Sequence, residues 1–205
     1  MDGVIVDSNP FHRRAWVEYN RRFGIETDEV MQQFMYGRRN DEIVRGFFGE
    51  RLAAEEVKAR GAAKERLYRE TIGPVLNEAL VPGIREFLER HHPLPMAVAT
   101  NAEPENLDFL LDKTALRPYF RVAVDGHQVA NPKPHPDIYL KTAGLLGAEP
   151  SDCVVFEDSY AGIQAARAAG MAVVGIQTTH QSLPGADLEI QNFTSPALEP
   201  WLASR

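Results

Sequence analysis

The hydrophobic residues of this chain follow two different periods along the sequence. Between Asn9 and Ile72 they recur at the three- to four-residue spacing of amphipathic helices. Asn9 can cap the first helix, Pro10 suits its first turn, and Gly24 ends it. The pattern predicts a small bundle of four helices. Their expected ranges are 9–23, 27–35, 40–48 and 53–72.

After the sequence ALVPG, short hydrophobic runs rich in β-branched residues alternate with amphipathic stretches. This alternation predicts an α/β fold with a doubly wound parallel sheet, in which helices cover both faces. The hydrophobic runs are residues 96–100, 120–124, 154–158 and 171–176. The expected helices between them are residues 104–114, 134–146 and 161–170. In such sheets, ligands bind at the carboxyl ends of the strands.

Composition narrows the class of protein further. The chain has 44% hydrophobic and 25% charged residues, which is typical of a soluble globular protein. Its formal net charge of −7 argues against a nucleic-acid partner and against binding to an anionic membrane. The apolar run GVIV is too short for a signal peptide, and no segment is long enough to span a membrane, so we expect a cytoplasmic protein. The single cysteine excludes an intrachain disulfide.

Polar residues suited to phosphate binding lie after three of the expected strands. Thr100 and Asn101 follow the first strand and can donate hydrogen bonds to phosphoryl oxygens. Lys133 lies between two prolines after the second strand and can neutralise phosphate charge from a stiff segment. Glu157 and Asp158 end the third strand and supply carboxylates of the kind that bind Mg²⁺.

Each of these signals has a simpler interpretation when it is taken alone. Thr100 and Asn101 can cap the following helix, the Pro-Lys-Pro segment can be a rigid loop, and the Glu-Asp pair can be a solvated turn. Their order along the chain favours phosphate chemistry over these alternatives. The opening sequence MDGVIVDS adds two further carboxylates, Asp2 and Asp7, on either side of an apolar run.

Four segments together resemble the sequence motifs of the haloacid dehalogenase-like (HAD) phosphatases. They are MDGVIVDS, ATNA, NPKPHPDIYL and VVFEDSYAGIQAARAAGM, in this order. The nearest likeness is to the subgroup that contains β-phosphoglucomutase and the phosphoglycolate phosphatases. The resemblance implies a Rossmann-like α/β core domain of residues 1–8 and 80–205, with an inserted helical cap domain of residues 9–79.

The resemblance implies roles for the matched acidic residues. Asp2 is expected to be the general acid/base, which protonates the leaving oxygen and then takes a proton from water. The backbone carbonyl of Asp2 is also expected to bind Mg²⁺. Glu157 and Asp158 are expected to be Mg²⁺ ligands, either directly or through water.

It also implies a phosphate-binding group. Thr100 and Asn101 match the second motif and are expected to hold the phosphoryl oxygens. Lys133 matches the third motif and is expected to balance the charge on the phosphate and on the attacking carboxylate.

The first motif departs from the family pattern. The family's nucleophilic aspartate would lie immediately before Met1, and the central strand that leads to it would be missing as well. Asp7 is no substitute, because it lies five residues beyond Asp2 and past the apolar run. We expect either a longer natural protein or a degenerate family member, and the other matched site residues favour the first. In both cases we expect the 205-residue chain to have little or no phosphatase activity.

Four residues of the cap are candidates for substrate recognition. His12 follows the first motif and resembles a histidine near the hinge of β-phosphoglucomutase. Arg38 and Arg39 lie between two cap helices, where they can bind a second phosphate or a sugar hydroxyl. Lys64 lies roughly where a cap lysine of the mutase faces the site. The simpler interpretation of all four is a surface or packed side chain without substrate contact.

The resemblance therefore predicts a Mg²⁺-dependent phosphatase that acts through an aspartyl-phosphate. The expected substrate is a small phosphorylated metabolite, with a sugar phosphate favoured, and the expected state is a monomer or weak dimer. A sugar-phosphate mutase of the β-phosphoglucomutase kind is the first alternative, and it needs the cap candidates to point into the site. A non-catalytic family member that keeps a phosphate pocket is the second alternative.

Overall fold

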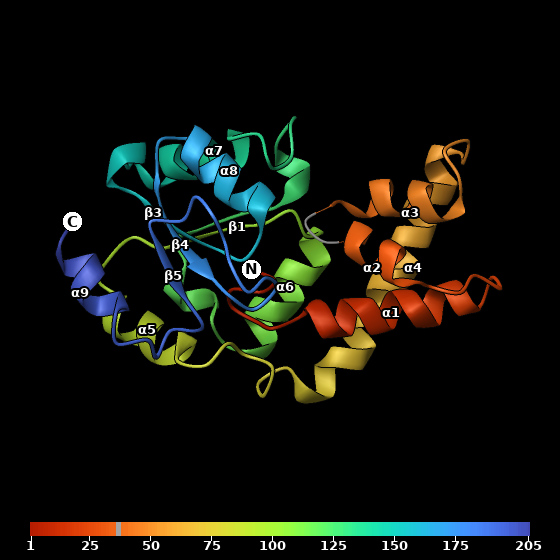
Figure 1. Ribbon diagram of the computed structural model, residues 1–205, viewed down its shortest axis with the longest axis horizontal. Helices are drawn as coiled ribbons and strands as arrows, with labels where there is room; N and C mark the ends of the chain where they lie inside the picture. Colours follow the sequence, from red (N-terminus) through yellow and green to blue (C-terminus); the bar gives the residue numbers. More distant parts are fainter. Residues whose placement is uncertain (36–37) are drawn as a thin grey trace.

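The computed structural model describes residues 1–35 and 38–205, and its helices and strands form two lobes (Figure 1). The smaller lobe confirms the four helices that the sequence pattern predicts. They are α1 (Asn9–Arg21), α2 (Glu29–Met35), α3 (Asn40–Phe48) and α4 (Ala54–Ile72). In the described part of the chain, no helix is both long enough and apolar enough to cross a membrane.

The start of α1 differs from the sequence-based prediction. Ser8, rather than Asn9, occupies the cap position, and no side chain caps the helix there. The side-chain amide of Asn9 instead donates hydrogen bonds to the hydroxyl of Thr179 at 2.5 Å and to the carboxylate of Asp158 at 3.4 Å. Local pattern could not reveal this, because both partners are distant in the sequence.

The larger lobe contains the parallel strands that the sequence predicts. Two parallel sheets are present, one with the order β1-β2 and one with the order β3-β4-β5. The strands are β1 (Ala97–Ala99), β2 (Val122–Val124), β3 (Val154–Glu157), β4 (Ala172–Ile176) and β5 (Leu188–Ile190). The helices of this lobe are α5 (Ile84–His91), α6 (Pro104–Lys113), α7 (Asp137–Leu146), α8 (Tyr160–Ala168) and α9 (Leu198–Ala203).

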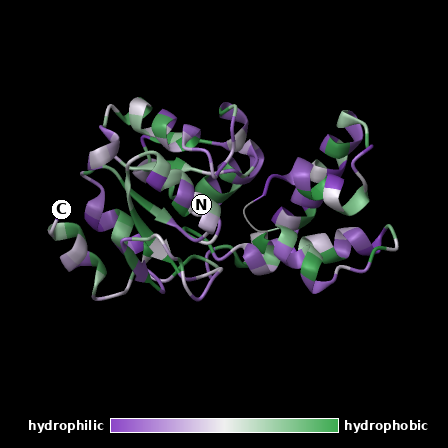
Figure 2. Ribbon diagram, turned by 45° about the horizontal axis from the view of Figure 1, so that its top comes forward, coloured by the Kyte–Doolittle hydropathy of each residue, from purple (hydrophilic) through white to green (hydrophobic). Residues whose placement is uncertain are grey.

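Helices cover both faces of the strands because successive strand residues point to opposite faces. In β4, Val173 packs in a hydrophobic cluster with residues of α7 and α8. Its neighbour Val174 packs in a second cluster with residues of α5 and α6. Figure 1 shows α7 and α8 on one side of the strands and α5 on the other, and the strands are mainly hydrophobic in Figure 2. The predicted α/β architecture with helices on both faces is confirmed.

The helical lobe has a hydrophobic cluster of its own. Trp16 is 1% exposed and packs edge-to-face on Phe47, with ring centroids 5.2 Å apart. Ile43 of α3 and Val57 of α4 complete the contact between helices. This cluster is separate from the two clusters that surround the strands.

A cavity of about 800 Å³ lies between the two sheets. It is lined by β1 on one side and by β3 on the other, together with α5 and the opening residues Met1, Val4 and Ile5. Among residues 1–35 and 38–205, no strand joins β1 to β3. The facing edges of these strands therefore lack backbone partners from a neighbouring strand, which is costly for a buried strand. The expected central strand ahead of Met1 stays a prediction.

The separate clusters lead to a prediction about stability. Trp16→Ala should reduce the free energy of unfolding by about 3–5 kcal/mol, because it removes a large buried side chain. Hydrogen exchange should accelerate in α3 before it accelerates in β4, since α3 contributes buried residues only to the cluster around Trp16, whereas α1 and α4 also pack on the strand lobe. Trp201→Ala in α9 is the control, and it should affect the strands instead. Equal acceleration in both lobes for Trp16→Ala would contradict the prediction.

Candidate active site

A cavity of about 480 Å³ opens where the carboxyl ends of β1 and β3 face the helical lobe. Its lining contains all ten side chains that the sequence suggested for catalysis, phosphate binding, metal binding or substrate recognition. They are Asp2, His12, Arg38, Arg39, Lys64, Thr100, Asn101, Lys133, Glu157 and Asp158. These residues come from seven separate segments of the chain, so the fold brings them together.

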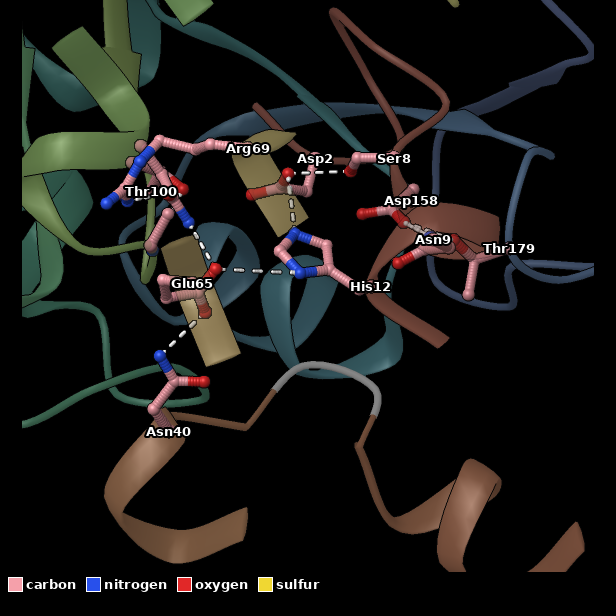
Figure 3. Close-up of polar contacts among 12 residues, drawn as sticks. Asp2, Ser8, Asn9, His12, Asn40, Glu65, Arg69, Thr100, Asp158 and Thr179 are labelled. Carbon is pink, nitrogen blue, oxygen red and sulfur yellow. Dashed lines mark hydrogen bonds and ion pairs between the residues drawn. The ribbon is translucent and has the colours of Figure 1, made fainter. Parts of the chain in front are cut away.

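Asp2 lies at the junction of the two lobes, and its carboxylate is held by two neighbours (Figure 3). Its Oδ1 accepts a hydrogen bond from the Ser8 hydroxyl at 2.6 Å and lies 3.4 Å from Nε2 of His12. Burial alone would raise the pKa of Asp2, but the contacts with His12 and Ser8 hold this pKa well below its usual value. Asp2 is therefore a carboxylate when no ligand is bound.

Lys133 and Glu157 form a buried ion pair at the end of β3. The side chains of Lys133 and Glu157 are 8% and 6% exposed. Glu157 also accepts hydrogen bonds from the Tyr139 hydroxyl at 2.5 Å and from the Ser159 hydroxyl at 3.1 Å. Burial favours the neutral acid, yet the charge of Lys133 and these hydrogen bonds lower the pKa of Glu157 to about 2. Glu157 thus anchors Lys133, and its own oxygens already have donors.

Asp158 lies beside this pair, and no cationic side chain among residues 1–35 and 38–205 forms an ion pair with it. Burial and the charge of Glu157 raise the pKa of Asp158 to about 6. Its carboxylate accepts hydrogen bonds from Thr179 and Asn9. It also packs against Gly3, where an added Cβ would lie only 2.0 Å from Oδ2 of Asp158. Only glycine at position 3 leaves room for this carboxylate.

The donor set around Asp158 fits a magnesium ion held mainly by water and substrate. Among residues 1–35 and 38–205, no three His, Cys, Asp or Glu side chains are grouped so that they could hold a metal. Mg²⁺ commonly uses only one or two protein carboxylates together with waters and substrate phosphate. Asp158 offers such a carboxylate, and its raised pKa reflects a negative charge that a cation would relieve.

Thr100 and Asn101 supply hydrogen-bonding groups at the end of β1. Thr100 is 4% exposed, and its hydroxyl oxygen accepts the backbone N–H of Ala102 at 3.1 Å. The hydroxyl hydrogen of Thr100 can therefore be donated to a ligand. The side-chain oxygen of Asn101 is buried and has no hydrogen-bond partner within the described residues. Thr100 and Asn101 thus have hydrogen-bonding capacity left for a ligand.

The cap candidates differ in how they face the cavity. Nζ of Lys64 lies 3.2 Å from Nδ1 of His12, and the Lys64 side chain is 2% exposed. The His12 ring stacks on Tyr68 with centroids 3.7 Å apart. Arg38 lies over the ring of Phe34. Lys64 is therefore buried and His12 is partly buried, and both contact other residues of the site.

Arg39 connects the two lobes directly. Its guanidinium donates a hydrogen bond to the backbone carbonyl of Gly126, which follows β2. Arg39 also begins α3, where its backbone N–H donates to the side chain of Glu42 at 3.2 Å. The loop that carries Arg38 and Arg39 is thereby attached to the strand lobe at the edge of the cavity.

The comparisons with known proteins agree with this site. A family model described as haloacid dehalogenase-like hydrolase matches residues 1–170. The chain belongs to this hydrolase family. It is 34% identical to the fructose-1-phosphate phosphatase YqaB of Escherichia coli over 179 residues, which cover 86% of this chain and 93% of that protein.

Other members of the HAD-like hydrolases also match over nearly the whole length. The chain is 31% identical to the β-phosphoglucomutase of Bacillus subtilis, with 97% of this chain and 91% of that protein covered. The crystal structure of β-phosphoglucomutase from Clostridium difficile matches with a TM-score of 0.86 and 25% identity, and covers 98% of this chain and 92% of that one. The family thus includes both a phosphatase and a mutase that are named for sugar phosphates.

Sequence reasoning missed several residues of this HAD-like site. Ser8 ends the first motif and Asn9 follows it, which was a signal for their position but not for their contacts. Glu65 follows Lys64 and is just as buried, although a charged helix position usually predicts solvent. Asn106 and Thr179 gave no signal, since their partners lie in other segments.

Glu157, which anchors Lys133, packs against Gly162, and substitution of this glycine tests the contact. An added Cβ at Gly162 in α8 would lie 2.0 Å from the Glu157 carboxyl carbon, whereas one at Gly144 in α7 meets nothing within 4 Å. Gly162→Ala should therefore destabilise the protein, while Gly144→Ala should stabilise it by up to about 1 kcal/mol. Urea unfolding measures both. Equal effects of the two variants would contradict the described contact.

The buried Lys64–Glu65 pair predicts a pH dependence of stability. Burial would raise the pKa of Glu65, but the charge of Lys64 and hydrogen bonds from Lys64 and Asn106 lower it to about 2, from a usual 4.5. A lowered folded-state pKa stabilises the fold above about pH 4.5, and this contribution is lost as the pH falls toward 2. The melting temperature of the wild type should thus fall more steeply between pH 5 and 3 than that of Glu65→Gln.

At neutral pH, Glu65→Gln should be less stable than the wild type by about 3–5 kcal/mol, because Lys64 is left buried without its carboxylate. Glu70→Gln changes an exposed residue of the same helix, so its melting temperature should follow that of the wild type at every pH. Parallel curves for the wild type and Glu65→Gln would refute a lowered pKa at Glu65.

Proposed function

We propose that this protein is a Mg²⁺-dependent phosphatase of a small phosphorylated metabolite, with a sugar phosphate as the favoured substrate. One observation carries the proposal. The cation of Lys133, the hydroxyl of Thr100 and the carboxylates of Asp2 and Asp158 all line one cavity. Matched relatives named as a fructose-1-phosphate phosphatase and a β-phosphoglucomutase support a sugar phosphate.

In this proposal, the strand lobe binds the phosphoryl group. Lys133 offsets its negative charge, and the ion pair with Glu157 holds the ammonium group in place. Thr100 and Asn101 donate hydrogen bonds to the phosphoryl oxygens, whose charge grows during transfer. Asp2 takes up a proton when the phosphate ester binds, gives it to the leaving oxygen, and then accepts a proton from the attacking water.

Asp158 and the backbone carbonyl of Asp2 would hold Mg²⁺ together with water and a phosphoryl oxygen. The ion would supply positive charge that offsets the charge of the phosphate and of the neighbouring carboxylates. Gly3 is part of this arrangement, since it leaves the space that the Asp158 carboxylate occupies.

The attacking carboxylate is proposed to belong to an aspartate immediately before Met1. Asp7 is exposed, and its backbone N–H bonds to Ala79, so it does not take this role in the proposal. The 205-residue chain should then release little or no phosphate. A chain extended at its N-terminus by an apolar strand that ends in Asp should be active.

A phosphate-release screen over a panel of phosphorylated metabolites tests the proposal. The 205-residue chain and the extended chain are compared, each with Mg²⁺ and with a chelator. We expect release from sugar monophosphates only for the extended chain with Mg²⁺. The matched control carries Asn in place of the added Asp and should be inactive, because an amide cannot form the aspartyl-phosphate.

Two outcomes would overturn the proposal. Robust Mg²⁺-dependent release by the 205-residue chain would show that the added aspartate is not the nucleophile. An extended chain that binds inorganic phosphate but turns over no substrate would favour a non-catalytic phosphate-binding protein instead.

A sugar-phosphate mutase is a second candidate, and a specific observation favours it. His12, Lys64 and the arginines at positions 38 and 39 all line the cavity beside Asp2, as a mutase would require. The two candidates differ in their product, because a mutase yields an isomeric sugar phosphate whereas a phosphatase yields free phosphate. Phosphorus NMR of the extended chain with a hexose 1-phosphate separates them.

A further inference from the structure

Glu65 is a buried carboxylate that takes no part in the chemistry proposed above. Its side chain is 5% exposed. Oε1 accepts hydrogen bonds from Nζ of Lys64 at 2.5 Å and from the side-chain amide of Asn40 at 2.6 Å. Oε2 accepts one from the side-chain amide of Asn106 at 2.7 Å. Both carboxylate oxygens are therefore engaged by donors from three elements of the fold.

These contacts cross the boundary between the lobes. Glu65 belongs to α4 of the helical lobe, whereas Asn106 belongs to α6 of the strand lobe. Two further bonds run in parallel, because Asn40 donates to Glu103 at 2.8 Å and Arg69 donates to Asn106 at 2.7 Å. Separation of the lobes would break all three contacts. They therefore form only when the lobes lie together as in this structure, which we call the closed arrangement.

On its other side, Glu65 leads to Asp2 through Lys64 and His12. Nδ1 of His12 lies 3.2 Å from the Lys64 ammonium and 3.9 Å from Oε2 of Glu65; because the ammonium has only donors, Nδ1 of a neutral His12 accepts from it. The ring proton of a neutral His12 is then on Nε2, which lies 3.4 Å from Oδ1 of Asp2. Figure 3 shows the His12 ring between Asp2 and Glu65.

We propose that Glu65 is a positioning residue that couples closure of the two lobes to the orientation of Asp2. Its carboxylate holds Lys64 against His12, which sets the tautomer that donates to Asp2. Its bond to Asn106 makes this arrangement dependent on the closed lobes. The proposal rests on the proposed function only in that Asp2 exchanges the proton of the reaction.

The charge of Glu65 is what the arrangement requires. Lys64 is buried and approaches the Trp16 ring at 4.9 Å on its other side, so a carboxylate is needed to keep the ammonium in place. A glutamine at position 65 can still bond to Asn106 through its oxygen, but it cannot neutralise Lys64. Glu65→Gln therefore removes the negative charge of the side chain and keeps its shape.

Nitrogen-15 NMR of the histidine rings tests the tautomer in the 205-residue chain. A His12→Gln variant assigns the His12 signals. In the wild type we expect the nitrogen-15 chemical shift of Nε2 to be that of a protonated ring nitrogen. The shift of Nδ1 should be that of an unprotonated nitrogen. In Glu65→Gln the two shifts should move toward each other as the tautomers mix, and Glu70→Gln should match the wild type.

A second variant keeps the Lys64–Glu65 pair intact in case Glu65→Gln folds poorly. Asn106→Leu removes the bonds that Asn106 of the strand lobe makes to Glu65 and to Arg69, and Glu105→Gln on the same helix is its exposed control. Loss of a hydrogen bond to a charged group should raise the hydrogen-exchange rate at the start of α6 and in α3 about tenfold or more. The control should exchange like the wild type.

Either of two results would overturn the proposal. One is a folded Glu65→Gln chain whose His12 signals match the wild type. The other is exchange in Asn106→Leu that equals exchange in Glu105→Gln. Both readouts are independent of phosphate release, so a failure of the proposed phosphatase activity would leave them interpretable. If the extended chain is active, Glu65→Gln should lower kcat far more than it raises KM.

Discussion

Two adjacent carboxylates, Glu157 and Asp158, are buried where β3 ends, and the site around them is built to accommodate their charge. Glu157 is neutralised by Lys133 and bonded by Tyr139, which lowers its pKa to about 2. Asp158 forms no ion pair within the described part of the chain, and burial together with the charge of Glu157 raises its pKa to about 6. Two glycines make room for these carboxylates, Gly162 for the first and Gly3 for the second. The result is one satisfied carboxylate and one that still lacks a positive partner.

The strand lobe could be predicted well from the sequence, for a simple geometric reason. Parallel strands end at the same edge of a sheet, so polar residues after several strands must meet. Thr100, Lys133 and the Glu157-Asp158 pair were found in this way, and the family motifs added the role of Asp2. The helical lobe was harder to predict, because helical period gives the buried face but not which charged residues it hides.

Glu65 and Thr179 illustrate that limit. In the sequence, Glu65 is one of many charged residues on a long helix, and only packing against α6 shows that it is buried. Thr179 lies in a polar segment with little pattern, yet its hydroxyl contacts Asp158 across the site. Asn9 looked like a helix cap, and the competing partner that takes its amide lies 170 residues away in the chain. Tertiary contacts overrode the local preference in each case.

The cavity between the two sheets gives Lys133 a mechanical role. Its ammonium pairs with Glu157 on β3 and also donates to the carbonyl of Ala99 on β1 at 3.4 Å. No strand among the described residues bridges β1 and β3, so this side chain supplies a polar contact between the two sheet edges in addition to their shared hydrophobic clusters. Thr100 is carried by one edge and Asp158 by the other. A bound anion that draws the Lys133 ammonium toward itself would weaken these two contacts. The distance between the Thr100 hydroxyl and the Asp158 carboxylate would then change.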